Sequence, residues 1–103
     1  MKSKVIASTG LTHGMCVTNI TLSPAESTEA HYHTKTTEVY TVLLGTGLLK
    51  HNQNEVQIRP GESFVIEPTD VHQVVNTGNV DLVILSSKDK PRQSKDYYSV
   101  TNF

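Results

Sequence analysis

Hydrophobic residues in this chain come in short runs, and each run ends at a cluster of turn-forming residues. We find no window of about a dozen residues with apolar positions at helical spacing. Several runs instead alternate between apolar and polar residues, as a strand with one buried face does. The pattern predicts strands over residues 5–8, 15–22, a segment beginning near His31, 38–44, 48–51, 55–59, 63–67, 71–76 and 80–86.

Turn signals separate these segments at intervals of roughly 8–12 residues, which is typical of a β-sandwich or a small β-barrel. They include Gly45-Thr46-Gly47, Asn52-Gln53-Asn54, Pro60-Gly61 and Pro68-Thr69-Asp70. We therefore expect an all-β fold.

The segment 38–44 (EVYTVLL) is the strongest predicted strand, because it is rich in β-branched and aromatic residues. Strict alternation places Glu38, Tyr40, Val42 and Leu44 on one side of it. A carboxylate at the head of an otherwise apolar face needs a partner. Glu38 is therefore a candidate functional residue.

The length of 103 residues fits one domain and excludes a two-domain enzyme. A formal net charge of -1 provides no field that would gather polyanions, so nucleic-acid binding is disfavoured. No run approaches the roughly 18 apolar residues of a membrane span, and residues 1–8 lack the apolar core of a signal peptide. We expect a cytoplasmic protein without a membrane segment. Its single cysteine, Cys16, cannot form an internal disulfide and is expected to be a small buried hydrophobe.

The predicted domain consists of a barrel over about residues 4–87 and a tail over residues 88–103. The tail begins with a polar, linker-like stretch (KDKPRQSKD), yet it holds three of the six aromatic residues in the chain: Tyr97, Tyr98 and Phe103. Exposure of all three would leave apolar area unused. We expect the tail to pack on the barrel or on a partner subunit.

Three histidines and one glutamate form the most informative pattern. His31 and His33 are two residues apart in a predicted strand, so their imidazoles point to the same side. His72 heads another strand, where it shares a side with Val74, as Glu38 heads the strand 38–44. Closure of the sheet could bring these strand ends together. Imidazoles with a carboxylate suit Fe, Mn, Co, Ni, Cu or Zn, whereas Ca²⁺ and Mg²⁺ prefer oxygen ligands alone.

Two segments resemble the conserved motifs of the cupin family. Residues 31–38 (HYHTKTTE), followed by Gly45, are similar to the first motif, H-x-H-x(3,4)-E-x(6)-G. Residues 61–76 (GESFVIEPTDVHQVVN) are similar to the second motif, which ends in H-x(3)-N. The resemblance implies a single antiparallel β-barrel of the jelly-roll type, also called a double-stranded β-helix. It also implies that His31, His33, Glu38 and His72 are the metal ligands.

The chain departs from the family pattern at two glycine positions. Ala25 stands where the first motif usually begins with Gly, and Thr69 stands at the glycine of the usual P-x-G in the second motif. Glycine tolerates backbone angles that alanine and threonine resist. The departures affect loop shape and remove no ligand.

We expect one divalent transition metal per chain, with two adjacent positions left open for water or a small oxygen-bearing metabolite. The simplest function is a metal-dependent enzyme. The resemblance implies dioxygenase-like chemistry for a redox-active metal and isomerase or lyase chemistry for a Lewis acid. The alternative is a non-catalytic cupin that binds or senses a small molecule, with or without metal.

Three further expectations concern single residues and assembly. Tyr40 is the candidate for proton transfer, although packing in the core is the more common reason for a tyrosine at such a position. His51 is expected to be a solvated residue of a hairpin. Exposed sheet edges in a short chain favour a homodimer, which the resemblance also implies.

Overall fold

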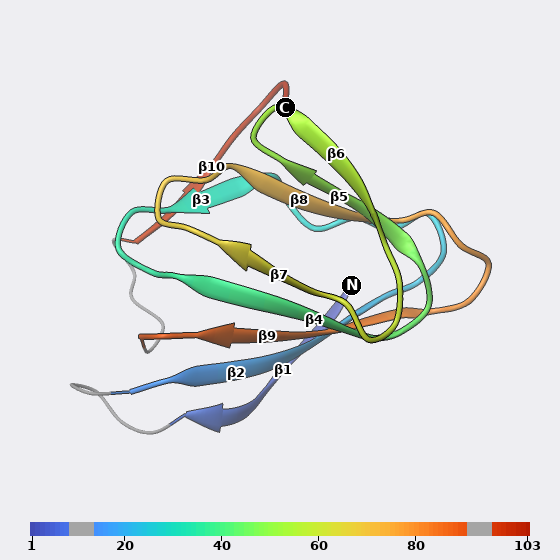
Figure 1. The fold of residues 1–103 in the computed structure, drawn as a ribbon, viewed down its shortest axis with the longest axis horizontal. Coiled ribbons are helices and arrows are strands. Elements are labelled where there is room, and N and C mark those ends of the chain that lie inside the picture. The colour runs from blue at the N-terminus through green and yellow to red at the C-terminus, as the bar shows by residue number, and fades with distance from the viewer. Residues whose placement is uncertain (9–13, 91–95) are drawn as a thin grey trace.

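Two five-stranded antiparallel sheets face each other in this protein (Figure 1). The computed structural model describes residues 1–8, 14–90 and 96–103. The first sheet has the order β1 (Lys2–Ser8), β2 (Cys16–Leu22), β9 (Leu82–Lys88), β4 (Glu38–Leu44) and β7 (Ser63–Ile66). The second has the order β10 (Tyr97–Ser99), β3 (His31–His33), β8 (His72–Asn76), β5 (Gly47–His51) and β6 (Asn54–Ile58).

The described residues form strands, turns and loops without any helix, which confirms the all-β prediction. The non-consecutive strand order within each sheet is that of a jelly roll. Strand β4 has the predicted bounds, while β9 continues two residues past its predicted end at Ser86. No helix among these residues could cross a membrane.

The hydrophobic core lies between the sheets and receives side chains from both. Its members share a position on an inward-facing side of a strand, and none is more than 2% exposed. They are Leu22, Tyr40, Val42, Leu49, Ile58, Ile66, Val74, Leu82 and Ile84. The period-two alternation predicted from the sequence therefore determines which residues form the core.

Leu44 does not belong to this core, so the expected alternation of β4 is wrong at its last position. Leu44 is 55% exposed. Val42 pairs with Ile84 and Leu44 with Val83, so two residues on β4 stand against one on β9. This β-bulge shifts the pleat by one residue and turns Leu44 away from the core.

The C-terminal segment extends the second sheet. Strand β10 lies beside β3 and pairs antiparallel with it (Figure 1). The register places Tyr97 opposite His33 and Ser99 opposite His31. Tyr98 stacks on Tyr32, with ring centroids 5.3 Å apart. Residues 91–95 of the predicted tail lie outside the described residues. The described end of the chain thus runs beside the strand that carries His31 and His33.

The two departures from the family glycines keep a glycine-like backbone. Ala25 has φ of 70° and Thr69 has φ of 72°, both in the left-handed region that disfavours residues with a Cβ. The Thr69 amide donates a hydrogen bond to the carbonyl of His33 at 2.6 Å. The turn before β8 is thereby tied to β3 although its residue is not glycine.

Candidate metal centre

Four buried side chains from three strands meet at one end of the interior. His31 and His33 come from β3, Glu38 from β4 and His72 from β8, and none is more than 8% exposed. One nitrogen or oxygen atom of each lies within 4.8 Å of the corresponding atoms of the other three. The structure therefore brings together all four residues that the sequence singled out.

Backbone carbonyls set the orientation of two of these histidines. Nδ1 of His31 lies 2.7 Å from the carbonyl oxygen of Glu29, and Nδ1 of His72 lies 2.9 Å from that of Asp70. A carbonyl oxygen only accepts, so each Nδ1 carries the proton and donates. In the neutral ring, Nε2 then keeps a lone pair, which is the form that binds a metal.

Three atoms at the centre of the cluster are buried without a hydrogen-bond partner: Nε2 of His33, Nε2 of His72 and Oε1 of Glu38. Oε1 lies 3.7 Å from the His33 nitrogen and 3.2 Å from the His72 nitrogen. Buried polar atoms without a partner are costly and rare in native proteins.

A cation at the centre would satisfy all three of these atoms. Metal–nitrogen and metal–oxygen bonds of about 2.0–2.2 Å place two ligands of one ion at most about 4.4 Å apart. The 4.8 Å spread of the cluster requires only a small contraction to reach that spacing. Three imidazoles and one carboxylate thus fit a divalent transition metal in composition and in position.

The ionisation states of the cluster also suit metal binding. Burial would raise the pKa of Glu38, but contacts with His72, Lys88 and Ser86 outweigh it and lower this pKa to about 2. The Ser86 hydroxyl donates to Oε2 of Glu38, and Nζ of Lys88 lies 3.9 Å from the same oxygen. Burial, reinforced by His72, lowers the pKa of His31 to about 4. Near neutral pH the cluster therefore holds a carboxylate and at least one neutral imidazole, as ligation requires.

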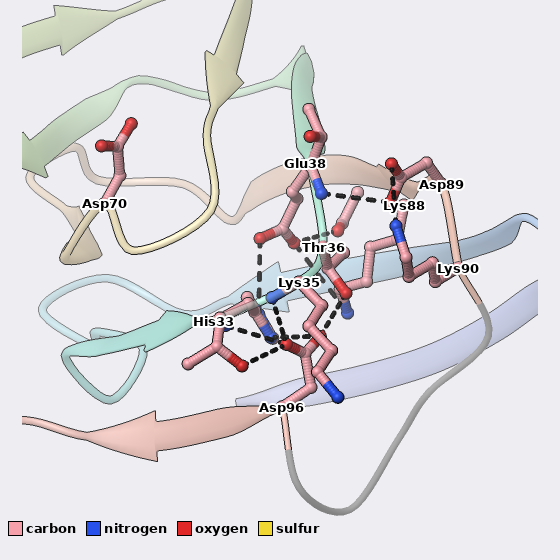
Figure 2. A network of polar contacts seen from close by, with 12 residues as sticks. His33, Lys35, Thr36, Glu38, Asp70, Lys88, Asp89, Lys90 and Asp96 are labelled. Carbon is pink, nitrogen blue, oxygen red and sulfur yellow. Dashed lines mark hydrogen bonds and ion pairs between the residues drawn. The ribbon is translucent and has the colours of Figure 1, made fainter.

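Asp96, which the sequence analysis did not identify, secures the connection between His33 and Glu38. Its Oδ1 accepts from the amides of Thr34 and Lys35 at 2.8 and 2.6 Å. Its Oδ2 accepts from the Thr36 hydroxyl and lies 3.8 Å from Nδ1 of His33 (Figure 2). These hydrogen bonds lower the pKa of Asp96 although burial opposes them. Asp96 has no fixed spacing from the two motifs, so they do not predict it. The one signal in the sequence was the expectation that the aromatic residues of the tail pack on the barrel.

Ser86 and Lys88 are two further site residues that sequence reasoning missed. On β9, Ser86 pairs with Tyr40 and Lys88 pairs with Glu38. The predicted strand ends at Ser86, which leaves Lys88 in the predicted tail. The signal was present, because the alternation that makes Leu82 and Ile84 inward-facing continues through both residues.

Two tyrosines enclose the cluster. Tyr40 is buried in the core, and its ring meets that of His72 edge-on with centroids 5.7 Å apart. Burial, followed by the charge of Glu38, raises the pKa of Tyr40 well above 10, so its hydroxyl keeps its proton. From β10, Tyr97 stacks on His31 with centroids 4.6 Å apart and donates a hydrogen bond to Glu29.

His51 is not the solvated hairpin residue that the sequence suggested. Its Nε2 lies 2.7 Å from Oδ2 of Asp70, and Asn52 donates to the other oxygen of Asp70 at 3.1 Å. The carbonyl of Asp70 in turn orients His72. His51 was misjudged because its partner lies in a turn that is distant in sequence. The contact holds the turn that presents a cluster histidine.

The motif resemblance is supported by a match to the cupin domain family over residues 18–88. The chain belongs to this family. Among curated proteins, an oxalate-binding protein of Thermotoga maritima is 35% identical to this cupin over 65 residues, which are 63% of this chain and 54% of that protein. The chain spans about half the length of the curated relatives it matches.

Solved structures show the same fold. A proposed sugar phosphate isomerase from Acidithiobacillus ferrooxidans is 29% identical to this cupin, with a TM-score of 0.74, over 87% of this chain and 58% of that one. A double-stranded β-helix protein from Klebsiella pneumoniae is 16% identical, with a TM-score of 0.79, over 96% of this chain and 86% of that one. The double-stranded β-helix expected from the motifs is therefore confirmed. The described strands form it as a sandwich of two sheets rather than as the closed barrel that was also expected.

Proposed function

We propose that this cupin binds one divalent transition metal ion per chain through His31, His33, Glu38 and His72. The observation that carries the proposal is the set of three buried nitrogen and oxygen atoms without a hydrogen-bond partner that face one another between the two sheets. Fe, Mn, Co, Ni, Cu and Zn all accept such a donor set. A bound ion would supply either Lewis-acid polarisation or redox chemistry to a small oxygen-bearing metabolite.

The protein's own residues prepare this site for a ligand. Glu38 contributes the single negative charge among the four proposed ligands, so a divalent ion keeps an excess positive charge that favours an oxygen donor. The aromatic rings of Tyr40 and Tyr97 lie against the imidazoles and limit the access of water. The ligand would meet a largely dry site with a fixed set of donors.

We favour a metal-dependent enzyme, dioxygenase-like with a redox-active metal or an isomerase or lyase with a Lewis acid. Tyr40 is the proposed residue for proton transfer, because its ring contacts His72 beside the cluster. Burial raises the pKa of its hydroxyl, so this group is a weak acid that keeps its proton and would act first as a hydrogen-bond donor to the ligand. Tyr40→Phe removes only the hydroxyl. We expect this variant to keep its metal and to lose turnover, and undiminished turnover would remove Tyr40 from the mechanism.

A second function, non-catalytic binding of a small molecule, is favoured by one specific observation. The Thermotoga maritima relative, 35% identical over 65 residues, is named for binding oxalate. An enzyme consumes its substrate with repeated turnover, whereas a binding protein saturates at a fixed stoichiometry. Oxalate and a panel of hydroxy acids and sugar phosphates, offered to the metal-loaded protein, separate the two functions.

The metal site is tested by elemental analysis of protein purified without added metal, beside the His33→Ala variant. We expect close to one transition-metal ion per chain in the wild type and a large loss in the variant. Gln53→Ala is the control, since it changes an exposed side chain of the turn between β5 and β6, outside the cluster. Equal metal content in all three proteins would defeat the assignment of the ligands.

We also propose that this cupin is a homodimer in the cytoplasm. Apolar side chains project outward from β4 and from the edge strand β7, where Leu43 and Val65 are 49% and 52% exposed. Contact with a second copy would cover them. The buried free thiol of Cys16 suits a reducing compartment. Light scattering after gel filtration measures the assembly, and cell fractionation measures the location.

A further inference from the structure

Lys88 on β9 carries an ammonium group on the inward-facing side of the first sheet. It pairs with Cys16 on β2 and with Glu38 on β4, and both of these side chains are buried. Directly opposite residues of an antiparallel pair project to the same face, so Lys88 points into the interior beside them. Its side chain is 19% exposed. Lysine is rarely buried unless its charge is paired.

The partners of Lys88 leave most of its hydrogen-bonding capacity unused. Within the described part of the chain its ammonium contacts Oε2 of Glu38 at 3.9 Å, which is too long for a hydrogen bond. An ammonium group has three donors. Lys90, two residues further along the chain, is more exposed, at 39%. Its Nζ lies 3.4 Å from Oδ2 of Asp89.

The position of Lys88 relative to the cluster matters for a ligand. Oε1 of Glu38 faces the histidines, while Oε2 faces Ser86 and Lys88. The ammonium is thus separated from the proposed ion by the width of one carboxylate group. Its flexible four-carbon stem allows the charge to move toward a molecule held at the ion.

The charges of the buried groups also favour an anion. Lys88 offsets one of the two buried carboxylates, Glu38 and Asp96, so a divalent ion would leave the site with net positive charge. A neutral ligand gains little from this field, whereas an oxyanion gains from both the ion and the ammonium.

We propose that Lys88 binds an anionic oxygen of the ligand, and that this cupin therefore acts on a small oxyanion, a carboxylate or a phosphate ester, rather than on a neutral metabolite. The inference rests on the proposed metal site. Two similar proteins, one described as oxalate-binding and one as a proposed sugar phosphate isomerase, are named for anions of this class.

Calorimetric titration of the Mn²⁺-loaded protein with glycolate, with inorganic phosphate and with the neutral amide glycolamide tests the proposal. In the wild type we expect at least one of the two anions to bind more tightly than glycolamide, and the preferred anion identifies carboxylate or phosphate as the source. Lys88→Met should weaken anion binding about 10-fold or more. It should leave glycolamide binding and the metal stoichiometry unchanged.

Two control variants keep the test specific. Lys88→Arg retains the positive charge and should recover part of the anion affinity. Lys90→Met removes the same charge from the solvent-facing end of the segment and should have little effect. Equal weakening by Lys90→Met would show a general effect of net charge and would overturn the role of Lys88.

The outcomes also separate this inference from the metal site. If the metal-loaded Lys88→Met variant binds anions with wild-type affinity, the inference is overturned and the metal site stands. Wild-type protein that takes up no Mn²⁺, Fe²⁺ or Zn²⁺ would overturn the proposed function, and the present inference with it. Wild-type protein that binds glycolamide as tightly as both anions would overturn the proposed ligand class alone.

Discussion

The interior between the two sheets has a polar end and an apolar end, and the same strands run through both. On β4, Glu38 lies at the polar end and Val42 at the apolar end, and they are 2% and 1% exposed. On β8, His72 and Val74 show the same contrast. Burial is equal at the two ends, but its energetic basis differs. The apolar end is stabilised by removing side chains from water, while the polar end depends on a partner for every charge and donor.

The largest expected effect on folding comes from the apolar end. Leu82 is fully buried, and Leu82→Ala leaves a cavity that should lower the free energy of unfolding by about 2–5 kcal/mol. Urea denaturation measures this change. The variant should still bind one metal ion per chain under conditions in which it is folded. Loss of metal binding by the folded variant would show that the two ends are not independent.

Asp96 should matter at the polar end both for stability and for the metal. Asp96→Ala removes the acceptor for the Thr34 and Lys35 amides, and the lost contacts should cost about 2–3 kcal/mol of unfolding free energy. The affinity for metal should fall about 10-fold, because the segment from His33 to Glu38 is no longer held.

Asp89→Ala is the matched control for Asp96. It also removes one carboxylate, but this one is exposed and accepts from the Thr37 amide at 3.1 Å. The control should retain nearly full stability and metal affinity. If the Asp96→Ala variant binds metal with wild-type affinity, Asp96 has no role in the metal site and only anchors the C-terminal tail.

Acid should weaken the polar end of the metal-free protein in a defined pH range. The pKa of His31 is about 4 in the folded protein and 6.5 as its ordinary value, since burial and His72 oppose its protonation. Between these values the unfolded state binds more protons than the folded state, so stability falls as the pH falls from about 6.5 to about 4.

Unfolding of the metal-free protein measured across this pH range checks the prediction. Each pKa unit corresponds to about 1.4 kcal/mol, so an effect on the order of 1–3 kcal/mol is expected for this histidine. Leu82→Ala should show the same pH dependence as the wild type, because it changes only the apolar end. A wild-type stability that is flat from pH 6.5 to pH 4 would contradict the burial of His31 as a neutral ring.

The smallest expected effect is a gain in stability. Thr69 has φ of 72°, and Thr69→Gly relieves this backbone strain while it increases the freedom of the unfolded chain. The net gain should be about 0.5–1 kcal/mol, visible as a higher urea midpoint. Pro68→Gly is a useful contrast, since Pro68 is not among the residues with positive φ and this change should destabilise. A loss of stability in Thr69→Gly would indicate that its side chain has a role of its own.

Much of the fold was predictable because strand alternation and turn residues are local signals. The bounds of β4 and the four residues of the cluster followed from residues close together in the two motifs. Leu44 was misassigned because a β-bulge depends on the neighbouring strand, which local alternation does not describe.

The missing parts of the site are tertiary in origin. Asp96 reaches the cluster only because β10 pairs with β3, and that pairing joins segments more than 60 residues apart in the chain. His51 meets Asp70 across a hairpin and a turn. Lys88 belongs to the site because β9 lies beside β4. Sequence periodicity gives the face of a strand, but it does not give the strand's neighbours.

The distribution of the cluster over both sheets has a kinetic consequence. His31, His33 and His72 belong to one sheet and Glu38 belongs to the other, so an ion bound by all four would join the sheets at the end where the apolar core is absent. Separation of the sheets would then require the release of a ligand before unfolding could proceed. In a chain without a disulfide among its described residues, such a cross-link would set the lifetime of the folded state and its resistance to proteases.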